Sequence, residues 1–328
     1  MTRSIAQKRA DFRALHTQGC FVIPNPWDTG SARYLEGLGY QALATTSSGF
    51  AWSRGHADGA LSRDQILAHL RELVAATDLP VNADFENGFA ADAQGVAESV
   101  RLAVETGDAD GALSRDQILA HLRELVAATD LPVNADFENG FAVDAQGVAE
   151  SVRLAVETGV AGLSIEDSTG NPDDPLFPID VAVERLRAAR RAIDAAGGDT
   201  LLVGRAENFF ANRPDLEDTI ARLRAYAEAG ADCLYAPGIK TREQIAAVVA
   251  AVAPKPVNLL VGATSELTMA DIAALGVRRV SVGGGMARAA WGGFIRAART
   301  LAEQGRFDGF ADATPGTELN AFFRPFAD

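Results

Sequence analysis

Residues 57–107 read ADGALSRDQILAHLRELVAATDLPVNADFENGFAADAQGVAESVRLAVETG, and residues 109–159 repeat this string with one change, Ala91 becoming Val143. Asp108 alone separates the two copies. Repeat architectures need about three or more units and tolerate drift between them. Two near-identical copies therefore indicate a recent or engineered tandem duplication inside a finished fold. Removing the 52 duplicated residues from 328 leaves a chain of 276.

Each copy predicts a helix, a strand and a second helix. In the first copy, Ser62 caps a helix whose apolar residues recur at helical spacing, residues 80–85 form a short strand, and residues 92–105 form the second helix. Outside the repeat, short apolar strands alternate with helices in the same way. With one copy counted, the chain predicts eight strands, at residues 20–24, 41–46, 80–85, 161–166, 200–203, 231–235, 256–261 and 279–282.

Eight strands alternating with helices in about 276 residues predict a (β/α)8 TIM barrel. We expect residues 1–328 to form this single barrel domain. A doubly wound sheet is the alternative, but no glycine-rich dinucleotide fingerprint follows the first strand. The Gly283-Gly-Gly run after the last strand lacks the spacing of such a fingerprint and indicates close backbone approach instead.

Strand number, tilt and shear are linked in a closed barrel, so a ninth strand cannot enter an eight-stranded ring without changing its register. Of the tandem copies at 57–107 and 109–159, only one αβα unit is therefore expected in the barrel, with the other extruded or swapped between subunits. The first copy is favoured because its use puts the chain break at the bottom face. Hybrids of the two copies would have nearly the same contacts.

Composition limits the partners. The net charge is −14 with no basic stripe, which disfavours nucleic acid and anionic membranes. The amino-terminal segment lacks the apolar core of a signal peptide, and no apolar run reaches membrane-spanning length. Cys20 and Cys233 match no metal or disulfide spacing. We expect a cytoplasmic protein that binds a small molecule, with no nucleic acid and no membrane partner.

In a TIM barrel the functional groups lie at the carboxyl ends of the strands. Those positions here hold several acids, one arginine and a few polar or aromatic residues: Trp27, Asp28, Ser47, Ser48, Gly49, Asp84, Glu86, Glu166, Asp167, Arg205, Glu207, Tyr235 and Asn258. Carboxylates with no neighbouring histidine or cysteine suit a hard cation such as Mg²⁺. Asp84 and Glu86 are two apart on one strand, so both side chains would face the barrel axis.

Each of these residues also has a purely structural interpretation. Asp84 and Glu86 could cap the next helix or lie solvated in a loop, Glu166 could be one of the many acids that follow a strand, and Arg205 could form a surface ion pair of little energetic value. Asp136 and Glu138 are the duplicates of Asp84 and Glu86 and are equivalent candidates.

Seven ordered strings carry a family resemblance: NPWD at 25–28, TSSGF at 46–50, ADG at 57–59, VNADFENGF at 81–89, GLSIEDS at 162–168, GRAEN at 204–208 and KPVN at 255–258. In this combination the chain resembles the isocitrate lyase/phosphoenolpyruvate mutase superfamily. The resemblance runs from about residue 5 to residue 300, interrupted only by the extra 52 residues.

The resemblance implies a TIM barrel with a Mg²⁺ site, or Mn²⁺ as an alternative, for 2-oxo acids or their enolates. It also implies a homo-oligomer, a tetramer or a dimer that exchanges its last helix. Asp84 would bind the metal directly, with Asp58, Glu86 and Glu166 holding its waters. Ser47, Ser48 and Gly49 would bind the substrate carboxylate and Arg205 the substrate's anionic group. Trp27 and Asn258 are further candidates for substrate binding, and Arg205, Glu207 and Asp58 for catalysis.

One loop departs from the family pattern. Lyases of the family carry a Lys-Cys-Gly-His type segment after the fourth strand and mutases carry a lysine there, whereas residues 168–178 (STGNPDDPLFP) contain no Lys, Cys or His. A cleavage that needs a thiol acid therefore lacks its donor. We expect a Mg²⁺-dependent carbon–carbon lyase or decarboxylase that acts on a small 2-oxo or 2-hydroxy acid through an enolate. Phosphonopyruvate-type mutase or hydrolase chemistry and a folded but inactive duplication variant are the alternatives.

Overall fold

The computed structural model describes residues 5–58, 60, 61, 63–82, 115, 119, 122, 123, 134–197 and 199–326. Its strands are all parallel and alternate with helices, as the sequence predicted. Seven of them form one curved sheet in the order β1-β9-β8-β7-β6-β5-β4, and β2 pairs with β3 in a second sheet. The strands are β1 (Phe21–Ile23), β2 (Leu43–Ala44), β3 (Val81–Asn82), β4 (Asn134–Asp136), β5 (Gly162–Glu166), β6 (Leu201–Arg205), β7 (Cys233–Tyr235), β8 (Val257–Leu260) and β9 (Arg279–Ser281).

The pairing of β1 with β9 brings the first and last strands of the chain together, which is how a barrel closes. A hydrogen bond joins the second sheet to the first, since the Ala44 amide of β2 donates to the Pro24 carbonyl after β1 at 2.9 Å. On its other side β2 pairs with β3, where the Thr45 amide donates to the Asn82 carbonyl at 2.8 Å. The fold is therefore the α/β barrel that the sequence predicted.

Both copies of the repeat contribute to this ring. The first copy supplies α4 (Arg63–Ala76) and β3, which pairs with β2, while the second supplies β4, which pairs with β5, and α7 (Ala145–Glu157). Asn82 and Asn134 occupy the same position in the two copies. Most of residues 83–133 lie outside the described part, so the expectation that only one complete unit fills the barrel stays a prediction.

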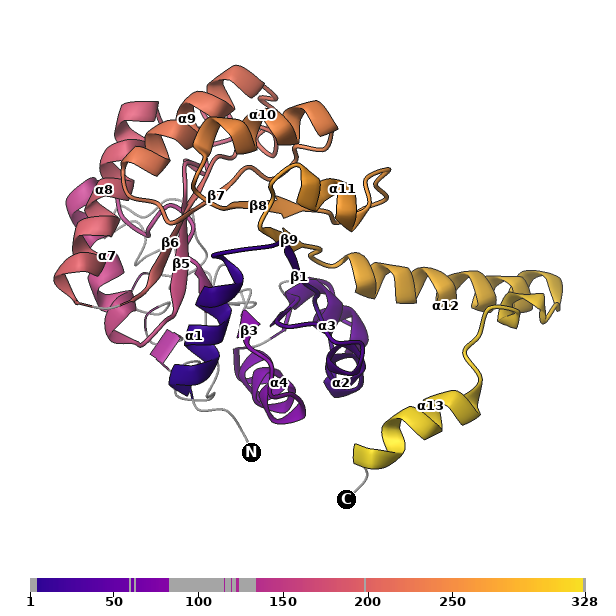
Figure 1. Ribbon diagram of the computed structural model, residues 1–328. Coiled ribbons are helices and arrows are strands. Elements are labelled where there is room, and N and C mark those ends of the chain that lie inside the picture. The colour runs from indigo at the N-terminus through magenta and orange to yellow at the C-terminus, as the bar shows by residue number, and fades with distance from the viewer. Residues whose placement is uncertain are drawn as a thin grey trace.

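Helices cover the outside of the strands (Figure 1). They are α1 (Ile5–Leu15), α2 (Thr29–Gly37), α3 (Ser47–Ser53), α4, α7, α8 (Ile179–Ala195), α9 (Leu216–Glu228), α10 (Arg242–Val252) and α11 (Met269–Ala274). Side-chain caps start many of them: Asp144 accepts from the Gly147 amide at 2.8 Å, and Asp215 accepts from the Asp218 amide at 3.0 Å. Such caps satisfy amides that have no partner inside the helix.

The amino-terminal helix packs against the first two strands. Phe12 of α1 is buried with Phe21 and Ile23 of β1 and with Ala42 and Ala44 near β2. His16 follows α1, and its ring lies edge-on to Phe12 and to Phe21, with centroids 5.0 Å from each. This cluster anchors α1 beside the amino ends of the strands.

The carboxyl-terminal part leaves the barrel. Helix α12 (Gly285–Gln304) extends away from the body in Figure 1, and α13 (Gly316–Phe323) turns back below it, with the Phe322 ring 4.8 Å from the Tyr34 ring of α2. Ala287 is the one residue of α12 that is buried, whereas Trp291, Phe294 and Ile295 are exposed, Phe294 by 63%. An apolar helix face in water is the feature expected of an association surface. In the described part, no helix is long and apolar enough to cross a membrane.

Candidate active site

The inward-facing residues of neighbouring strands form one row across the sheet. The ladder pairs Glu166 with Arg205, Arg205 with Tyr235, Tyr235 with Asn258, and Asn258 with Arg279. Side chains of paired residues in a parallel sheet point to the same face. The row therefore brings an acid, two arginines, a phenol and an amide into the barrel mouth and interior.

Arg205, at the end of β6, is the centre of the site. Its Nη1 donates to Asp136 Oδ2 at 2.8 Å, its Nε lies 3.3 Å from Glu166 Oε2, and its Nε also donates to Glu207 Oε1. Its guanidinium stands 5.4 Å from the centre of the Tyr235 ring. The surface ion pair considered for Arg205 is thus excluded, because the side chain is only 17% exposed and serves three carboxylates.

The three acids differ in how they are held. Asp136 also accepts a hydrogen bond from Ser164 Oγ at 2.9 Å. Glu166 has no such hydroxyl partner in the part of the chain that the structure describes, and its backbone amide donates to the Glu138 carbonyl at 2.8 Å. Glu138 itself has a positive φ of 41°, an uncommon backbone conformation for a residue other than glycine. The loop after β4 is therefore bent sharply where it passes the site.

Burial raises the pKa values of two acids at this site, and repulsion from neighbouring acids adds to the effect. Burial raises the pKa of Glu166 well above its usual range, and the negative charges of Asp136, Glu207 and Glu138 add to the effect while Arg205 opposes it. Burial likewise raises the pKa of Glu207, again with Arg205 in opposition. Burial and the site acids also raise the pKa of Tyr235. Strongly shifted carboxylates at a strand end are typical of a catalytic site.

A buried network behind the site holds Glu207 in place. Asp167 is 1% exposed; its Oδ1 accepts the Glu207 amide at 2.8 Å, and its Oδ2 accepts Tyr226 Oη at 2.6 Å and Arg222 Nη1 at 3.0 Å. The sequence placed Asp167 at a strand end but gave no sign of its partners, because both come from α9, more than fifty residues later. Asp167 therefore orients the mouth rather than lining it.

A second arginine holds the loop after β4. Arg185 of α8 is 1% exposed and donates to the carbonyls of Asn139 at 2.7 Å, Ala142 at 2.6 Å and Val143 at 3.0 Å. Three carbonyl acceptors compensate the burial of its charge. The position of Glu138 thus depends on a helix that follows the next strand.

The row opens onto a cavity of about 260 Å³ inside the barrel. Every strand of the ring contributes to its lining, which is made up of Ile23, Asn25, Ala44, Asn82, Asn134, Asp136, Ser164, Val203, Arg205, Phe210, Tyr235, Asn258, Leu260, Arg279, Ser281 and Gly283. This volume lies below the range of about 300–1,000 Å³ typical of pockets for drug-sized ligands. The cavity therefore suits a small, polar molecule.

The predicted substrate-binding serines lie beside this cavity. Ser47, Ser48 and Gly49 form the start of α3, where Thr46 caps the helix by accepting the Gly49 amide at 3.2 Å. A Cβ on Gly49 would lie 3.2 Å from Trp27 Cβ and closer still to Thr46 and Ala287, so only glycine fits. The run Ser47-Ser48-Gly49 and Trp27 are absent from the cavity lining, whereas Arg205 and Asn258 belong to it.

The glycine run after β9 packs closely against Ser48 and Gly262. A Cβ on Gly284 would lie 2.9 Å from Ser48 Oγ, and one on Gly285 would lie 3.4 Å from the Gly262 carbonyl. This close approach is what the sequence indicated for residues 283–285.

Four other acids were predicted at strand ends or as metal ligands: Asp28, Asp58, Asp84 and Glu86. Asp58, predicted to hold a metal-bound water, is exposed in the turn after α3. Asp84 and Glu86 lie outside the described residues, so their duplicates Asp136 and Glu138 represent that strand in the structure. Asp28, the acid that follows β1, caps α2 by accepting a hydrogen bond from the Ser31 amide at 2.7 Å. Capping was the structural role that the sequence analysis considered for acids at strand ends.

The donor atoms can be tested against a metal ion. Asp136, Glu138, Glu166 and Glu207 offer carboxylate oxygens alone, the ligands that Mg²⁺ prefers. Burial is the main cause that raises the pKa values of Glu166 and Glu207, and the neighbouring acids add to it while Arg205 opposes it. Within the described part, no group of three His, Cys, Asp or Glu residues is arranged as a ready-made metal site. The chemistry of the site thus fits a hard cation, with Arg205 now lying between the candidate ligands.

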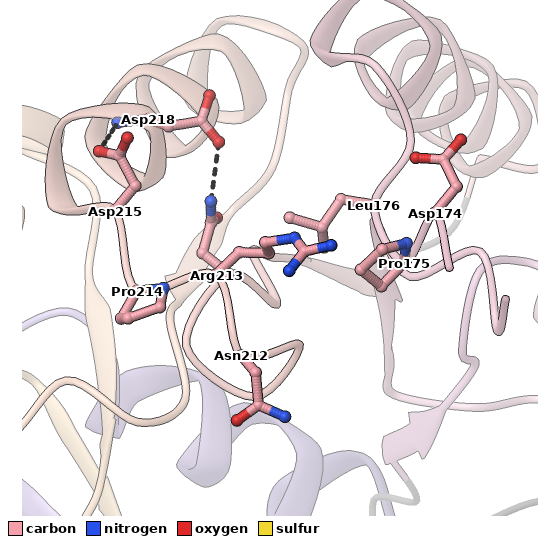
Figure 2. A pocket seen from close by; sticks show the side chains of 9 residues that line it. Asp174, Pro175, Leu176, Asn212, Arg213, Pro214, Asp215 and Asp218 are labelled. Atoms are coloured by element: carbon pink, nitrogen blue, oxygen red, sulfur yellow. Dashed lines mark hydrogen bonds between the residues drawn. The ribbon is translucent and has the colours of Figure 1, made fainter. Parts of the chain in front are cut away.

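A second hollow lies outside the mouth, between the loop after β5 and the loop after β6 (Figure 2). Its volume is about 530 Å³, and Arg213 lies across it between Asp215 and Asp218 on one side and Asp174 and Leu176 on the other. Asp218 accepts from Asn208 at 2.7 Å and from Arg222 at 2.7 Å. Since Asp215 caps α9, both of these acids already have structural partners.

Comparison with known proteins identifies the family of this chain. The profile of the phosphoenolpyruvate phosphomutase family matches residues 12–109 and 99–302. The chain therefore belongs to this family, within the isocitrate lyase/phosphoenolpyruvate mutase superfamily of enzymes.

Three known proteins are similar to this chain in sequence or in fold. A protein from Burkholderia cenocepacia J2315, provisionally described as a lyase/mutase, is 42% identical and superimposes with a TM-score of 0.68 over 98% of this chain and 97% of its own. The structure of 2,3-dimethylmalate lyase shares the fold, with 22% identity and a TM-score of 0.59 over 98% and 95%. The oxaloacetate decarboxylase of Bradyrhizobium sp. strain ORS 278 is 34% identical over 54% of this chain and 60% of its own length.

Proposed function

We propose that this chain is a Mg²⁺-dependent carbon–carbon lyase or decarboxylase that acts on a small 2-oxo or 2-hydroxy carboxylic acid and releases pyruvate or a similar oxo acid. The observation that carries the proposal is the group of buried acids around Arg205 in the barrel mouth. The relatives described as lyases and as an oxaloacetate decarboxylase support the same reaction class.

Asp136 and Glu166 would hold the metal, with Glu138 beside them. Mg²⁺ supplies a Lewis acid that stabilises an enolate. Arg205 keeps these carboxylates together, and Ser164 fixes the orientation of Asp136 through its hydroxyl. The narrow cavity of about 260 Å³ limits the substrate to a few carbon atoms.

The enolate left after bond cleavage needs a proton. The loop at 168–178 offers no Lys, Cys or His for this purpose. Glu207 is 6% exposed and has a raised pKa, so it can keep a proton at a pH where an exposed glutamate is ionised. We assign the proton donor to Glu207, whose backbone Asp167 holds in place.

The test is a screen for pyruvate release from oxaloacetate and substituted malates, with Mg²⁺ and with EDTA. Mg²⁺ without protein sets the background, because the free ion also promotes decarboxylation of oxaloacetate. We expect turnover above this background that EDTA abolishes and that Glu207→Gln strongly reduces. Glu217→Gln, an exposed acid on α9, is the matched control. No metal-dependent turnover of any acid would refute the proposal and favour the inactive duplication variant.

Phosphonate chemistry is the second candidate, because the family profile carries the name of a phosphomutase. Phosphorus NMR of the protein incubated with phosphonopyruvate separates the two candidates. A new phosphorus signal without pyruvate release from malates would favour the mutase or hydrolase.

We also propose that the protein forms a homo-oligomer through α12. Trp291, Phe294 and Ile295 expose their apolar surfaces on this helix, which packs on little of its own barrel. A neighbouring copy would cover this face, and light scattering measures the resulting mass.

A further inference from the structure

The barrel cavity contains a cation that the proposed chemistry does not use. Arg279 opens β9, is 7% exposed and lines the same cavity as Arg205. It forms no ion pair with any residue in the described ranges, whereas Arg205 contacts three carboxylates. A buried charge without a counter-charge is costly, so its position requires a reason.

Neutral groups hold the Arg279 guanidinium from two sides. Its Nε donates to Asn258 Oδ1 at 2.9 Å, and its Nη1 lies 3.5 Å from His16 Nε2. His16 Nδ1 lies 2.9 Å from the Phe12 carbonyl, which can only accept, so the proton sits on Nδ1. Burial, reinforced by the charge of Arg279, lowers the pKa of His16 to about 4, and the ring therefore stays neutral. These contacts orient Arg279 without cancelling its charge.

The third nitrogen of the guanidinium is left for a ligand. Nη2 has no hydrogen-bond partner among the described residues, and the Arg279 side chain lines the cavity, so this nitrogen is available to a ligand there. Beside it, Ser281 Oγ accepts from Asn258 Nδ2 at 3.2 Å, which leaves the serine proton available to a further acceptor. Arg279 and Ser281 thus present two donors to one cavity.

Charge separates this group from Arg205. An anion that approaches Arg205 meets Asp136, Glu166 and Glu207 at the same time, and repulsion from these acids offsets the attraction. An anion at Arg279 meets an amide, a hydroxyl and a neutral imidazole. Since Arg279 begins its strand and Arg205 ends its own, the two arginines mark different levels of the cavity.

We propose that Arg279, with Ser281, forms a carboxylate subsite inside the barrel, so that the enzyme prefers small dicarboxylates over monocarboxylates. This inference rests on the proposed function, in which the carboxylates around Arg205 and their metal take the reacting end of the substrate. The second carboxylate then pairs with Arg279 by charge-assisted hydrogen bonds. Asn258 is a positioning residue, since it fixes both Arg279 and Ser281.

The test compares the affinities of the full chain for malonate and for acetate by calorimetry in buffer that contains Mg²⁺. The wild type is expected to bind malonate at least about tenfold more tightly than acetate. Arg279→Met should reduce the affinity for malonate about tenfold and leave the affinity for acetate nearly unchanged. Arg278→Met is the matched control, because this neighbouring arginine points away and donates to the Gly19 carbonyl at 2.8 Å.

Three results would overturn the subsite: a wild type that binds both acids equally, an Arg279→Met variant that keeps the preference, or an equal loss in Arg278→Met. The comparison of malonate with acetate in the wild type needs no variant, so it tests the subsite even if Arg279→Met fails to fold. In that case Arg279→Lys is the second variant, and it should keep part of the preference for malonate. A malonate preference that depends on Arg279, without turnover of any acid, refutes the lyase and supports the subsite. Metal-dependent turnover without such a preference refutes the subsite alone.

Discussion

Because His69 is buried, we predict that the folded protein loses stability in mild acid. The ring is 5% exposed, stacks on Phe50 with centroids 3.7 Å apart, and leaves Nε2 without a partner. Burial lowers the pKa of His69 to about 4, with the charge of Arg54 acting in the same direction and that of Asp28 against it. The folded protein therefore keeps His69 neutral at a pH where the unfolded chain protonates it.

The sign and size of the effect follow from this difference. The folded pKa lies below the unfolded value of about 6.5, so the unfolded state binds more protons as the pH falls. Stability is fully present above about pH 6.5 and is lost progressively toward pH 4. The shift corresponds to about 3 kcal/mol in total, of which about 2 kcal/mol is lost by about pH 5. His16, whose pKa is also lowered to about 4, adds a loss of similar size.

The assay is urea unfolding followed by circular dichroism between about pH 5 and pH 8. His69→Phe keeps a ring against Phe50 and removes the titrating group, so about half of the histidine-linked loss should disappear. His56→Phe is the control, because His56 is exposed. An unchanged pH dependence in His69→Phe, or an equal change in His56→Phe, would refute the assignment.

Three further predictions follow from buried or exposed groups. Tyr226→Phe removes the 2.6 Å hydrogen bond to Asp167 and should cost about 1.5–3 kcal/mol in thermal unfolding, whereas the exposed Tyr34→Phe should cost little. Glu166→Gln should raise the melting temperature near neutral pH, because the raised pKa means that ionised Glu166 destabilises the fold. The same change should abolish Mg²⁺-dependent turnover. A lower melting temperature would contradict the first expectation. Phe294→Glu on α12 should reduce the mass seen by light scattering, and an unchanged mass would locate the interface elsewhere.

Sequence patterning determined the order of the elements. Short apolar runs bounded by glycine, proline and polar residues placed all eight expected strands within a few residues of their observed positions. The sequence also predicted that helices alternate with these strands, because apolar stripes and caps are local features. The short helix α3 and the terminal α13 were missed, since seven or eight residues carry too little periodicity to be recognised.

Family motifs and strand-end positions also identified part of the site. Arg205, Glu166, Asp136 and Glu207 come together as the rule for barrels predicts, because the ends of parallel strands meet at one mouth. Asp58 is exposed in the turn after α3, and its role stays a prediction. The sequence could place each residue on a strand or a loop. It could not give the position of the side chain along the barrel axis.

In the duplicated stretch, sequence and tertiary structure determined different things. The sequence by itself determined that the chain is a parallel α/β barrel with a metal-type carboxylate motif and that this motif is present twice, because strand periodicity and identity are local properties. Only the tertiary structure decided that Val81–Asn82 of one copy pairs with β2 while Asn134–Asp136 of the other pairs with β5, since identical strings have identical local preferences. It also decided that Arg205 is held by three acids and Arg279 by no acid of the described residues, because charge balance depends on contacts between residues far apart in the chain.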